Sequence, residues 1–324
     1  MSKLFLQLQR VFGEQRVKSN EPMNAHTTFR SGGSAQVFLA VDTVDDLVKA
    51  CSIARQNGVS VRVFGAGSNL IASDKGISGL VIKNNCRRFE ILSMVGRVAN
   101  TKVDLNQVLV FAEAGVILNQ LVRFTLDQGL SGLEYQLGLP GTVGGAVFMN
   151  GNYPKEEKHI GEAVYRAKLL LSDGSIKEVD STYFHFKFNK SALSDTGAIL
   201  LSVIFRLFSM DKKALWDKAT EAINYRNDTH PAEKAGGLTF RNIRIENPQN
   251  LLSPNQYTIE YLIDRAGIKG KRLGDAAISA RNPRYILNMG NASNADVLML
   301  IASVKEDIEK MFGLRLIMDI APVT

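Results

Sequence analysis

The sequence predicts an α+β fold that is divided into two domains. Residues 163–208 alternate between apolar and polar side chains, as the strands of an antiparallel sheet do. Other segments repeat apolar residues at helical spacing, most clearly residues 294–311. The composition also changes near Met210, and a chain of 324 residues is long enough to form two separate cores.

The first part of the chain mixes helices and strands. A helix is expected at the N-terminus, where five apolar residues share one face, and this pattern differs from that of a signal peptide. A second helix is expected from Thr43, which caps it together with Asp46, to Asn57. The apolar residues of the first helix are Leu4, Phe5, Leu8, Val11 and Phe12. The other expected elements are strands at 35–41, 59–64, 79–83 and 108–113, and a helix at 117–128.

The second part of the chain is expected to begin with the hairpin of the antiparallel segment and to continue with helices. Asp173 and Gly174 form its turn, between strands at 165–172 and 175–179, and a further strand covers 198–208. Helices are expected at 212–225, 257–266 and 294–311, and Gly313 ends the last one. A C-terminal strand is expected from Leu314 to the end of the chain, because apolar residues alternate there.

Composition and charge limit the classes of partner. The formal net charge of +7 favours anionic partners, but the basic residues are scattered. Nucleic acid is not expected as a partner, since the chain has no Lys/Arg block and no zinc-type spacing. No stretch approaches the roughly 18 apolar residues of a membrane span. Cys51 and Cys86 are the two cysteines, which favours a reducing compartment and a cytoplasmic location.

The most informative short motif is Gly65-Ala66-Gly67-Ser68-Asn69-Leu70, directly after an expected strand. Two glycines one residue apart let the backbone turn tightly and direct N–H groups toward phosphate oxygens. The motif is not a Rossmann fingerprint, because Leu70 stands where that pattern requires a third glycine. An ordinary glycine turn after a strand remains the alternative.

A second glycine-rich loop occupies residues 130–146 and leads into Gly145–Asn150. A loop of this composition can place the start of a helix against an anion. The alternative is a tight connection between packed elements. Two such loops in one domain favour the interpretation that they bind phosphate groups.

Five motifs together point to a known family: Thr28–Gly33, Gly65–Asp74, Glu113-Ala114-Gly115, Gly132–Asn150 and Gly290-Asn291-Ala292. With these motifs the sequence resembles the UDP-N-acetylenolpyruvoylglucosamine reductases, the MurB family. The resemblance spans nearly the whole chain and keeps the motif order.

The resemblance implies an FAD-binding fold of the vanillyl-alcohol-oxidase type with a second, smaller α+β substrate domain. The FAD-binding domain would cover 1–210, as subdomains of about 1–64 and 65–210, with the strand at 314–324 returning to it. The substrate domain would cover 211–313. FAD would be the cofactor, NADPH the reductant and a UDP-sugar the substrate, for peptidoglycan precursor synthesis. The sequence leaves the oligomeric state open and favours a monomer.

Binding residues follow from the resemblance position by position. Arg241, Asn242 and Arg272 would bind the UDP-sugar, although an exposed surface role is the alternative for the basic residues. The residues expected to hold FAD are Arg30, Gly65, Gly67, Ser68, Asn69, Pro140, Gly141, Thr142, Gly144 and Gly145.

The expected catalytic positions depart from the family pattern. The family reduces an enolpyruvyl double bond, a reaction that needs a proton donor and stabilisation of a developing negative charge. Leu238 stands at the position of the family's serine donor, and Asn189 stands at the position of its arginine. Asp319 aligns with the family's glutamate and keeps the carboxylate. Thr239 or water would then have to replace the lost donor.

Three functions therefore stay open on the sequence. The leading one is an FAD-dependent, NADPH-linked reductase with an altered reaction centre. The second is an FAD-binding pseudoenzyme, since the flavin motifs are kept and the catalytic positions are changed. The third is a flavoprotein that acts on a different substrate.

Overall fold

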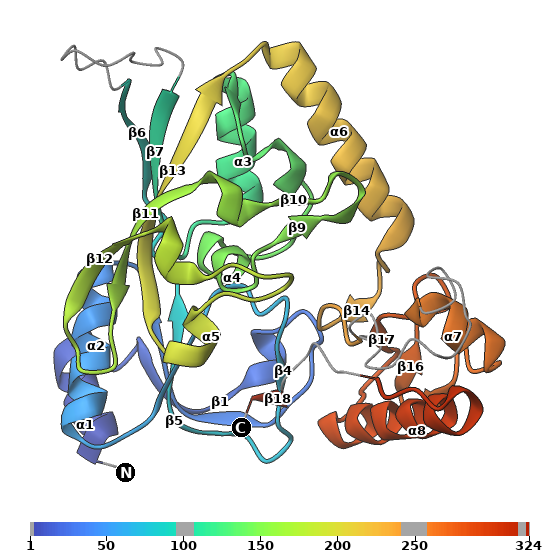
Figure 1. Ribbon diagram of the computed structural model, residues 1–324. Coiled ribbons are helices and arrows are strands. Elements are labelled where there is room, and N and C mark those ends of the chain that lie inside the picture. Colours follow the sequence, from blue (N-terminus) through green and yellow to red (C-terminus); the bar gives the residue numbers. More distant parts are fainter. Residues whose placement is uncertain (1–2, 95–106, 241–257, 317–321, 324) are drawn as a thin grey trace. The chain divides into compact units, whose positions relative to one another are not determined.

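The computed structural model describes residues 3–94, 107–240, 258–316 and 322–323 (Figure 1). Helices and strands both contribute, which confirms the α+β class. The chain forms two compact units: the first contains Met1–Lys18, Val37–Ala66 and Gly79–Arg226, and the second contains Ser19–Gln36, Gly67–Ser78 and Asn227–Thr324. No helix in the described residues is both long and apolar enough to cross a membrane.

The helices match most of the expected positions. Helix α4 begins two residues before the expected Gly145, and α6 continues past the expected end at Tyr225. The helices are α1 (Lys3–Phe12), α2 (Val44–Gln56), α3 (Leu118–Asp127), α4 (Val143–Phe148), α5 (Leu193–Thr196), α6 (Lys212–Thr229), α7 (Ile259–Arg265) and α8 (Asn294–Phe312).

The strands are mostly short outside the antiparallel segment. Those of the first half of the chain are β1 (Val17–Pro22), β2 (Ser34–Val41), β3 (Val61–Phe64), β4 (Ile71–Ala72), β5 (Ile77–Asn84), β6 (Phe89–Met94), β7 (Gln107–Glu113), β8 (Leu130–Ser131) and β9 (Asn152–Tyr153). Those of the second half are β10 (Lys158–His159), β11 (Val164–Leu170), β12 (Ile176–Asp180), β13 (Ile199–Ser209), β14 (Lys234–Ala235), β15 (Arg272–Leu273), β16 (Ala276–Ile278), β17 (Ile286–Asn288) and β18 (Pro322–Val323).

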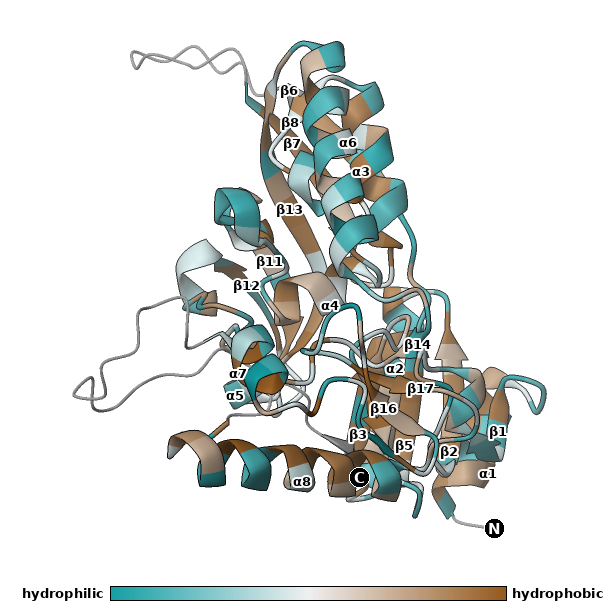
Figure 2. Ribbon diagram, turned by 90° about the vertical axis from the view of Figure 1, so that its right-hand side faces the viewer, coloured by the Kyte–Doolittle hydropathy of each residue, from teal (hydrophilic) through white to brown (hydrophobic). Residues whose placement is uncertain are grey.

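The first unit is built on the expected antiparallel sheet, whose path runs β12-β11-β13-β7-β6. The β11–β12 hairpin turns at Gly174, which has a φ of 86° that glycine adopts without strain. Strand β13 is buried along most of its length, and Figure 2 shows it largely in the hydrophobic colour. Residues of α3, α4 and α6 join the same apolar core, so the sheet supplies a rigid support for α4.

A second core in the first unit lies around α1 and α2. Thr43 caps α2 by accepting a hydrogen bond from the backbone N–H of Asp46, as predicted. Four of the five apolar residues predicted on α1 are buried, but Val11 is 39% exposed, so its predicted place on the buried face was wrong. The neighbouring sheet has the order β1-β2-β5-β3, and β3 runs parallel to β5. Strand β3 ends at Phe64, directly before Gly65.

The second unit contains the sheet β14-β17-β16-β15 and the helices α7 and α8, which share one apolar core. Ser293 caps α8 at its start, and Gly313 ends it with a φ of 68°, as predicted. Asp74 also accepts hydrogen bonds from the first two backbone N–H groups of this helix, each at 2.8 Å. The predicted C-terminal strand is shorter than expected, because residues 314–316 are not in a strand. Its described part, β18, pairs in parallel with β4.

Candidate functional site

The two glycine loops of the first unit meet directly. Gly65 follows β3, and Thr142 is the N-cap of α4. A Cβ atom placed on Gly65 would lie 2.2 Å from Thr142 Oγ1, far inside contact distance. The Thr142 side chain also accepts a hydrogen bond from the N–H of Gly145 at 3.4 Å. The two glycine loops are therefore in contact at Gly65 and Thr142.

Helix α4 is held at its start by backbone hydrogen bonds. The N–H of Gly144 donates to the carbonyl of Ala114 at 2.8 Å, and a Cβ on Gly144 would lie 3.0 Å from the Ala114 side chain. The carbonyl of Gly141 accepts from Leu118 at 3.1 Å. Packing alone therefore explains why residue 144 is a glycine.

Gly145 differs from its neighbour, because the protein does not fill the space beside it. Apart from its chain neighbours and the backbone of its own helix, a Cβ there would have a single neighbour within 4 Å among the described residues, Thr142 Oγ1 at 3.7 Å. Gly145 is exposed, as is the predicted cofactor residue Pro140. Nothing in the packing of the described residues requires a glycine at this position, so its small size leaves room for a group from outside the chain.

The second unit brings together three loops that are distant in the sequence. Gly67 has a φ of 68°, and a Cβ on it would lie 2.3 Å from the carbonyl oxygen of His26. The N–H of Thr28 donates to the carbonyl of Gly67 at 3.1 Å, and its hydroxyl donates to the carbonyl of Ala235 at 2.7 Å. The loop 24–33, the residues after Gly67 and strand β14 thus form one cluster.

The remaining polar residues of the first motif also lie in this cluster. A Cβ on Gly237 would lie 2.0 Å from Asn69 Oδ1, so the Asn69 side chain lies against the loop that precedes Leu238. Ser68 is half-buried. Arg30 is exposed with a φ of 56°, and among the described residues its guanidinium has no recorded hydrogen bond or ion pair. An exposed cation and exposed polar side chains suit an anionic ligand.

Thr239 is fully buried and its hydroxyl is used inside the protein. Thr239 Oγ1 accepts a hydrogen bond from the N–H of Ile286 at 3.2 Å, and the Thr239 N–H donates to the carbonyl of Arg284 at 2.8 Å. Leu238, the residue before it, is half-buried. The hydroxyl of Thr239 is therefore tied to β17 and cannot simply replace a serine hydroxyl at position 238.

Asn189 lies at the tip of a tight hairpin in the first unit. The backbones of Lys187 and Lys190 pair on either side, and Asn189 has a φ of 52° in the left-handed region, which Asn tolerates better than Arg. Its Oδ1 accepts a hydrogen bond from Asn152 Nδ2 at 2.6 Å. Asn189, which the sequence analysis placed at the family's arginine position, is thus 8% exposed and bonded within the protein.

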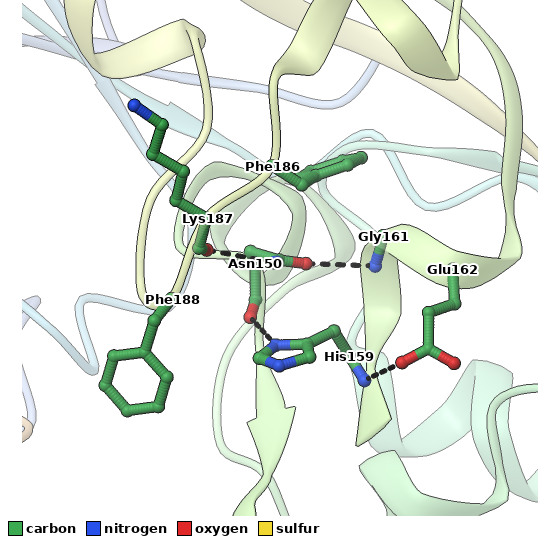
Figure 3. Close-up of a pocket in the computed structure, with 7 residues that line it drawn as sticks. All are labelled: Asn150, His159, Gly161, Glu162, Phe186, Lys187 and Phe188. Atoms are coloured by element: carbon green, nitrogen blue, oxygen red, sulfur yellow. Dashed lines mark hydrogen bonds between the residues drawn. The ribbon is translucent and has the colours of Figure 1, made fainter. Parts of the chain in front are cut away.

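A pocket of about 280 Å³ lies beside this hairpin (Figure 3). Asn150 joins its two sides, because its side chain accepts from the N–H of Gly161 and donates to the carbonyl of Lys187. Sequence reasoning missed this pocket, because its walls come from the segment after α4 and from the hairpin. The residues that line it are Asn150, His159, Gly161, Glu162, Phe186, Lys187 and Phe188.

The predicted substrate residues are less well placed. Arg272 is exposed, and its Nη2 lies 3.9 Å from Asp275 Oδ1, a weak surface pair. Lys271 is held by Ser303 and Asp307. The predicted residues Arg241, Asn242 and Asp319 lie outside the residues that the structure describes. No group of His, Cys, Asp and Glu in the described part of the chain is arranged to hold a metal ion.

Comparison with known proteins identifies both parts of the chain. Residues 35–180 match the FAD binding domain family, which confirms the cofactor expectation of FAD. Residues 230–323 match the C-terminal domain of UDP-N-acetylenolpyruvoylglucosamine reductase.

Relatives cover almost the whole chain. The UDP-N-acetylenolpyruvoylglucosamine reductase of Halalkalibacterium halodurans is 32% identical over 94% of this chain and 92% of its own length. That of Agathobacter rectalis is 35% identical over 92% of this chain and 90% of its own length.

A solved structure agrees with the sequence relatives. The crystal structure of the reductase (MurB) from Thermus caldophilus matches with a TM-score of 0.73 and 28% identity, covering 95% of this chain and 99% of its own. This match confirms the predicted FAD-binding fold. The chain belongs to the UDP-N-acetylenolpyruvoylglucosamine reductase family.

Proposed function

We propose that this protein binds FAD and a UDP-sugar and acts as an NADPH-linked reductase of an enolpyruvyl group. Family membership over nearly the full length supports the reaction class. The observation that carries the proposal is Gly145, where the described residues leave open a space that a side chain would otherwise occupy. When bound, FAD would supply hydride transfer, as flavins do in other enzymes.

The residues of the site fit a dinucleotide cofactor. Within the second unit, the exposed side chains of Arg30 and Asn69 offer donors to the oxygens of a diphosphate. We assign cofactor binding to 1–210 and UDP-sugar binding to 211–313. The proposed cofactor residues are Arg30, Gly65, Gly67, Ser68, Asn69, Pro140, Gly141, Thr142, Gly144 and Gly145; the proposed substrate residues are Arg241, Asn242 and Arg272.

Protonation is the step that this chain supports least well. Leu238 has no exchangeable proton, and the hydroxyl of Thr239 is buried against β17. Loss of a positioned proton donor costs about 100-fold to 10,000-fold in rate. Slow turnover with a proton delivered by water is therefore the expected behaviour of the reductase.

A second candidate is a pseudoenzyme that binds the same ligands without turnover. The hydrogen bond from Asn152 to Asn189 favours this candidate, because the side chain at the family's arginine position is satisfied within the protein. The left-handed backbone at Asn189 also disfavours a long charged side chain there by about 1–2 kcal/mol.

Spectroscopy and steady-state kinetics test both candidates. The purified protein should be yellow, release FAD on denaturation and oxidise NADPH faster when the enolpyruvyl substrate is present. A Leu238→Ser, Asn189→Arg variant should gain rate, whereas a Leu238→Ala, Asn189→Arg control should not, because it adds no hydroxyl. Wild-type turnover at ordinary enzymatic rates would rule out the pseudoenzyme, and a colourless protein that takes up no added FAD would refute both candidates.

A further inference from the structure

Arg284 in the second unit has a largely buried guanidinium with two unused hydrogen-bond donors. Its side chain is 13% exposed. Its Nε and Nη2 atoms are hidden from solvent and have no hydrogen-bond partner among the described residues. A buried donor without a partner is unfavourable, and a buried unpaired cation is more so, because each has lost its bonds to water.

The ion pair recorded for Arg284 does not relieve this. Glu260 Oε1 lies 3.9 Å from Arg284 Nε, which is beyond hydrogen-bond distance. The Glu260 side chain is itself 44% exposed, so water screens its charge. Glu260 is therefore a weak partner for this guanidinium.

Another arginine shows how this chain satisfies a buried guanidinium when the role is structural. Arg226 is 4% exposed, and its side chain donates to the carbonyls of Leu137 at 2.8 Å and Asn152 at 3.1 Å. It also lies over the ring of Tyr153. By contrast, the described residues leave the Nε and Nη2 donors of Arg284 unused, so these donors are available to a ligand.

The backbone around Arg284 is fixed and lies beside the altered reaction-centre loop. The Arg284 N–H donates to Asn282 Oδ1 at 3.1 Å, while its carbonyl accepts from Thr239 and, at 3.4 Å, from Phe240. Thr239 directly follows Leu238. The residue is thus held in place next to the segment in which the proposed reductase has lost its donor.

We propose that Arg284 binds an oxyanion of the substrate, a carboxylate or phosphate group, through Nε and Nη2. These two nitrogens lie on one edge of the planar guanidinium, which matches the two oxygens of such a group. The identity of the substrate rests on the proposed function, but the oxyanion site does not. Glu260 competes for the same edge and is displaced on binding.

Titrations of the purified protein test this with matched variants. The probes are inorganic pyrophosphate, pyruvate, UDP-N-acetylglucosamine and its enolpyruvyl ether, followed by changes in Tm and by calorimetry. Arg284→Met should weaken binding about tenfold to hundredfold, since bonds to a charged group are lost. Arg284→Lys should weaken it less, and Glu260→Gln should strengthen it. Arg281→Gln, at an exposed arginine of the same segment, should match wild type.

The pattern of loss identifies the group that is bound. A loss confined to pyruvate and the enolpyruvyl ether indicates the carboxylate, whereas a loss that includes pyrophosphate and UDP-N-acetylglucosamine indicates the diphosphate. If wild type binds a simple anion through Arg284 but no nucleotide sugar, the proposed function fails and the oxyanion site stands.

The Tm of the variants without ligand distinguishes a binding role of Arg284 from a structural one. Without ligand, Arg284→Met should have a Tm equal to or above that of wild type, because it removes an unpaired buried charge. The inference is overturned if Arg284→Met and Arg284→Lys bind every probe as wild type does, if wild type binds none of them, or if Arg284→Met and Glu260→Gln both lower Tm by several degrees.

Discussion

A Gly145→Ala substitution separates cofactor binding from folding. Gly145 is in the first turn of α4 and its φ is not in the left-handed region. Outside its chain neighbours and the backbone of its own helix, an added methyl group would meet no described atom within 4 Å except Thr142 Oγ1 at 3.7 Å, an ordinary contact. The substitution is therefore compatible with the protein alone.

Gly145→Ala is expected to raise the stability of the protein and to lower its affinity for FAD. Replacing a helical glycine by alanine stabilises by about 0.5–1 kcal/mol, because the unfolded chain has less backbone freedom to lose. For a chain of this size that raises Tm by about 1 °C. A methyl group placed where a diphosphate packs costs about 1–3 kcal/mol of binding, as overpacking does in cores. This corresponds to roughly a fivefold to 150-fold weaker affinity for FAD.

Flavin fluorescence during titration of the FAD-stripped protein measures the affinity, and thermal unfolding of the same sample measures stability. Gly144→Ala is the contrasting variant, since its methyl group would lie 3.0 Å from the Ala114 side chain and carbonyl oxygen and should lower Tm. Equal FAD affinity in wild type and Gly145→Ala would refute the assignment of the open space to the cofactor.

Other substitutions test the supporting contacts. Asp74→Ala removes the acceptor of two N–H groups at the start of α8 and should cost about 1–2 kcal/mol in chemical unfolding, with Asp74→Asn losing less. Thr239→Val leaves the N–H of Ile286 unpaired and should cost about 1–3 kcal/mol; a lower NADPH oxidation rate without any loss of stability would instead show that Thr239 donates the proton. Burial raises the pKa of Cys51 to about 11 and is the main cause that raises the pKa of Cys86 to about 12. Both thiols should therefore resist a thiol reagent at pH 8 until denaturant is added, and rapid labelling of the folded protein would contradict this. Because unfolded thiols lose their protons from about pH 8.5 while the folded ones keep them, stability should fall as pH rises above that value.

Local sequence signals predicted the elements that depend on neighbouring residues. The cap at Thr43, the hairpin turn at Gly174 and the stop at Gly313 all formed where their residue types required them. The prediction for Val11 was wrong because the buried face of a helix has a limited width. The elements that pack against the helix decide which residues at the border of that face are buried. The predicted C-terminal strand was wrong at residues 314–316, because alternation of apolar residues does not supply a partner strand, whereas Pro322–Val323 pairs with β4.

Long-range contacts could not be predicted from the sequence, because local patterns do not show which distant segments pack together. Gly65 must be small because of Thr142, and Gly67 must be small because of the carbonyl of His26. Each of these neighbours is many residues away, so periodicity and local motif chemistry do not reveal it. The unused donors of Arg284 could not be predicted from the sequence either, because the residues around them come from separate segments of the second unit.

The close contacts at most of these glycines limit what the glycine motifs indicate about function. At Gly65, Gly67, Gly144 and Gly237, a side chain would strike the protein itself, so a pseudoenzyme would need these glycines as much as a reductase does. Their presence therefore supports the fold and leaves both functions open. Gly145 is the position in the two loops where small size serves no described contact, and so a cofactor is the simplest reason for it. The family match supports FAD binding, the proposed role of Gly145 is tested by Gly145→Ala, and turnover must be judged separately at Leu238 and Asn189.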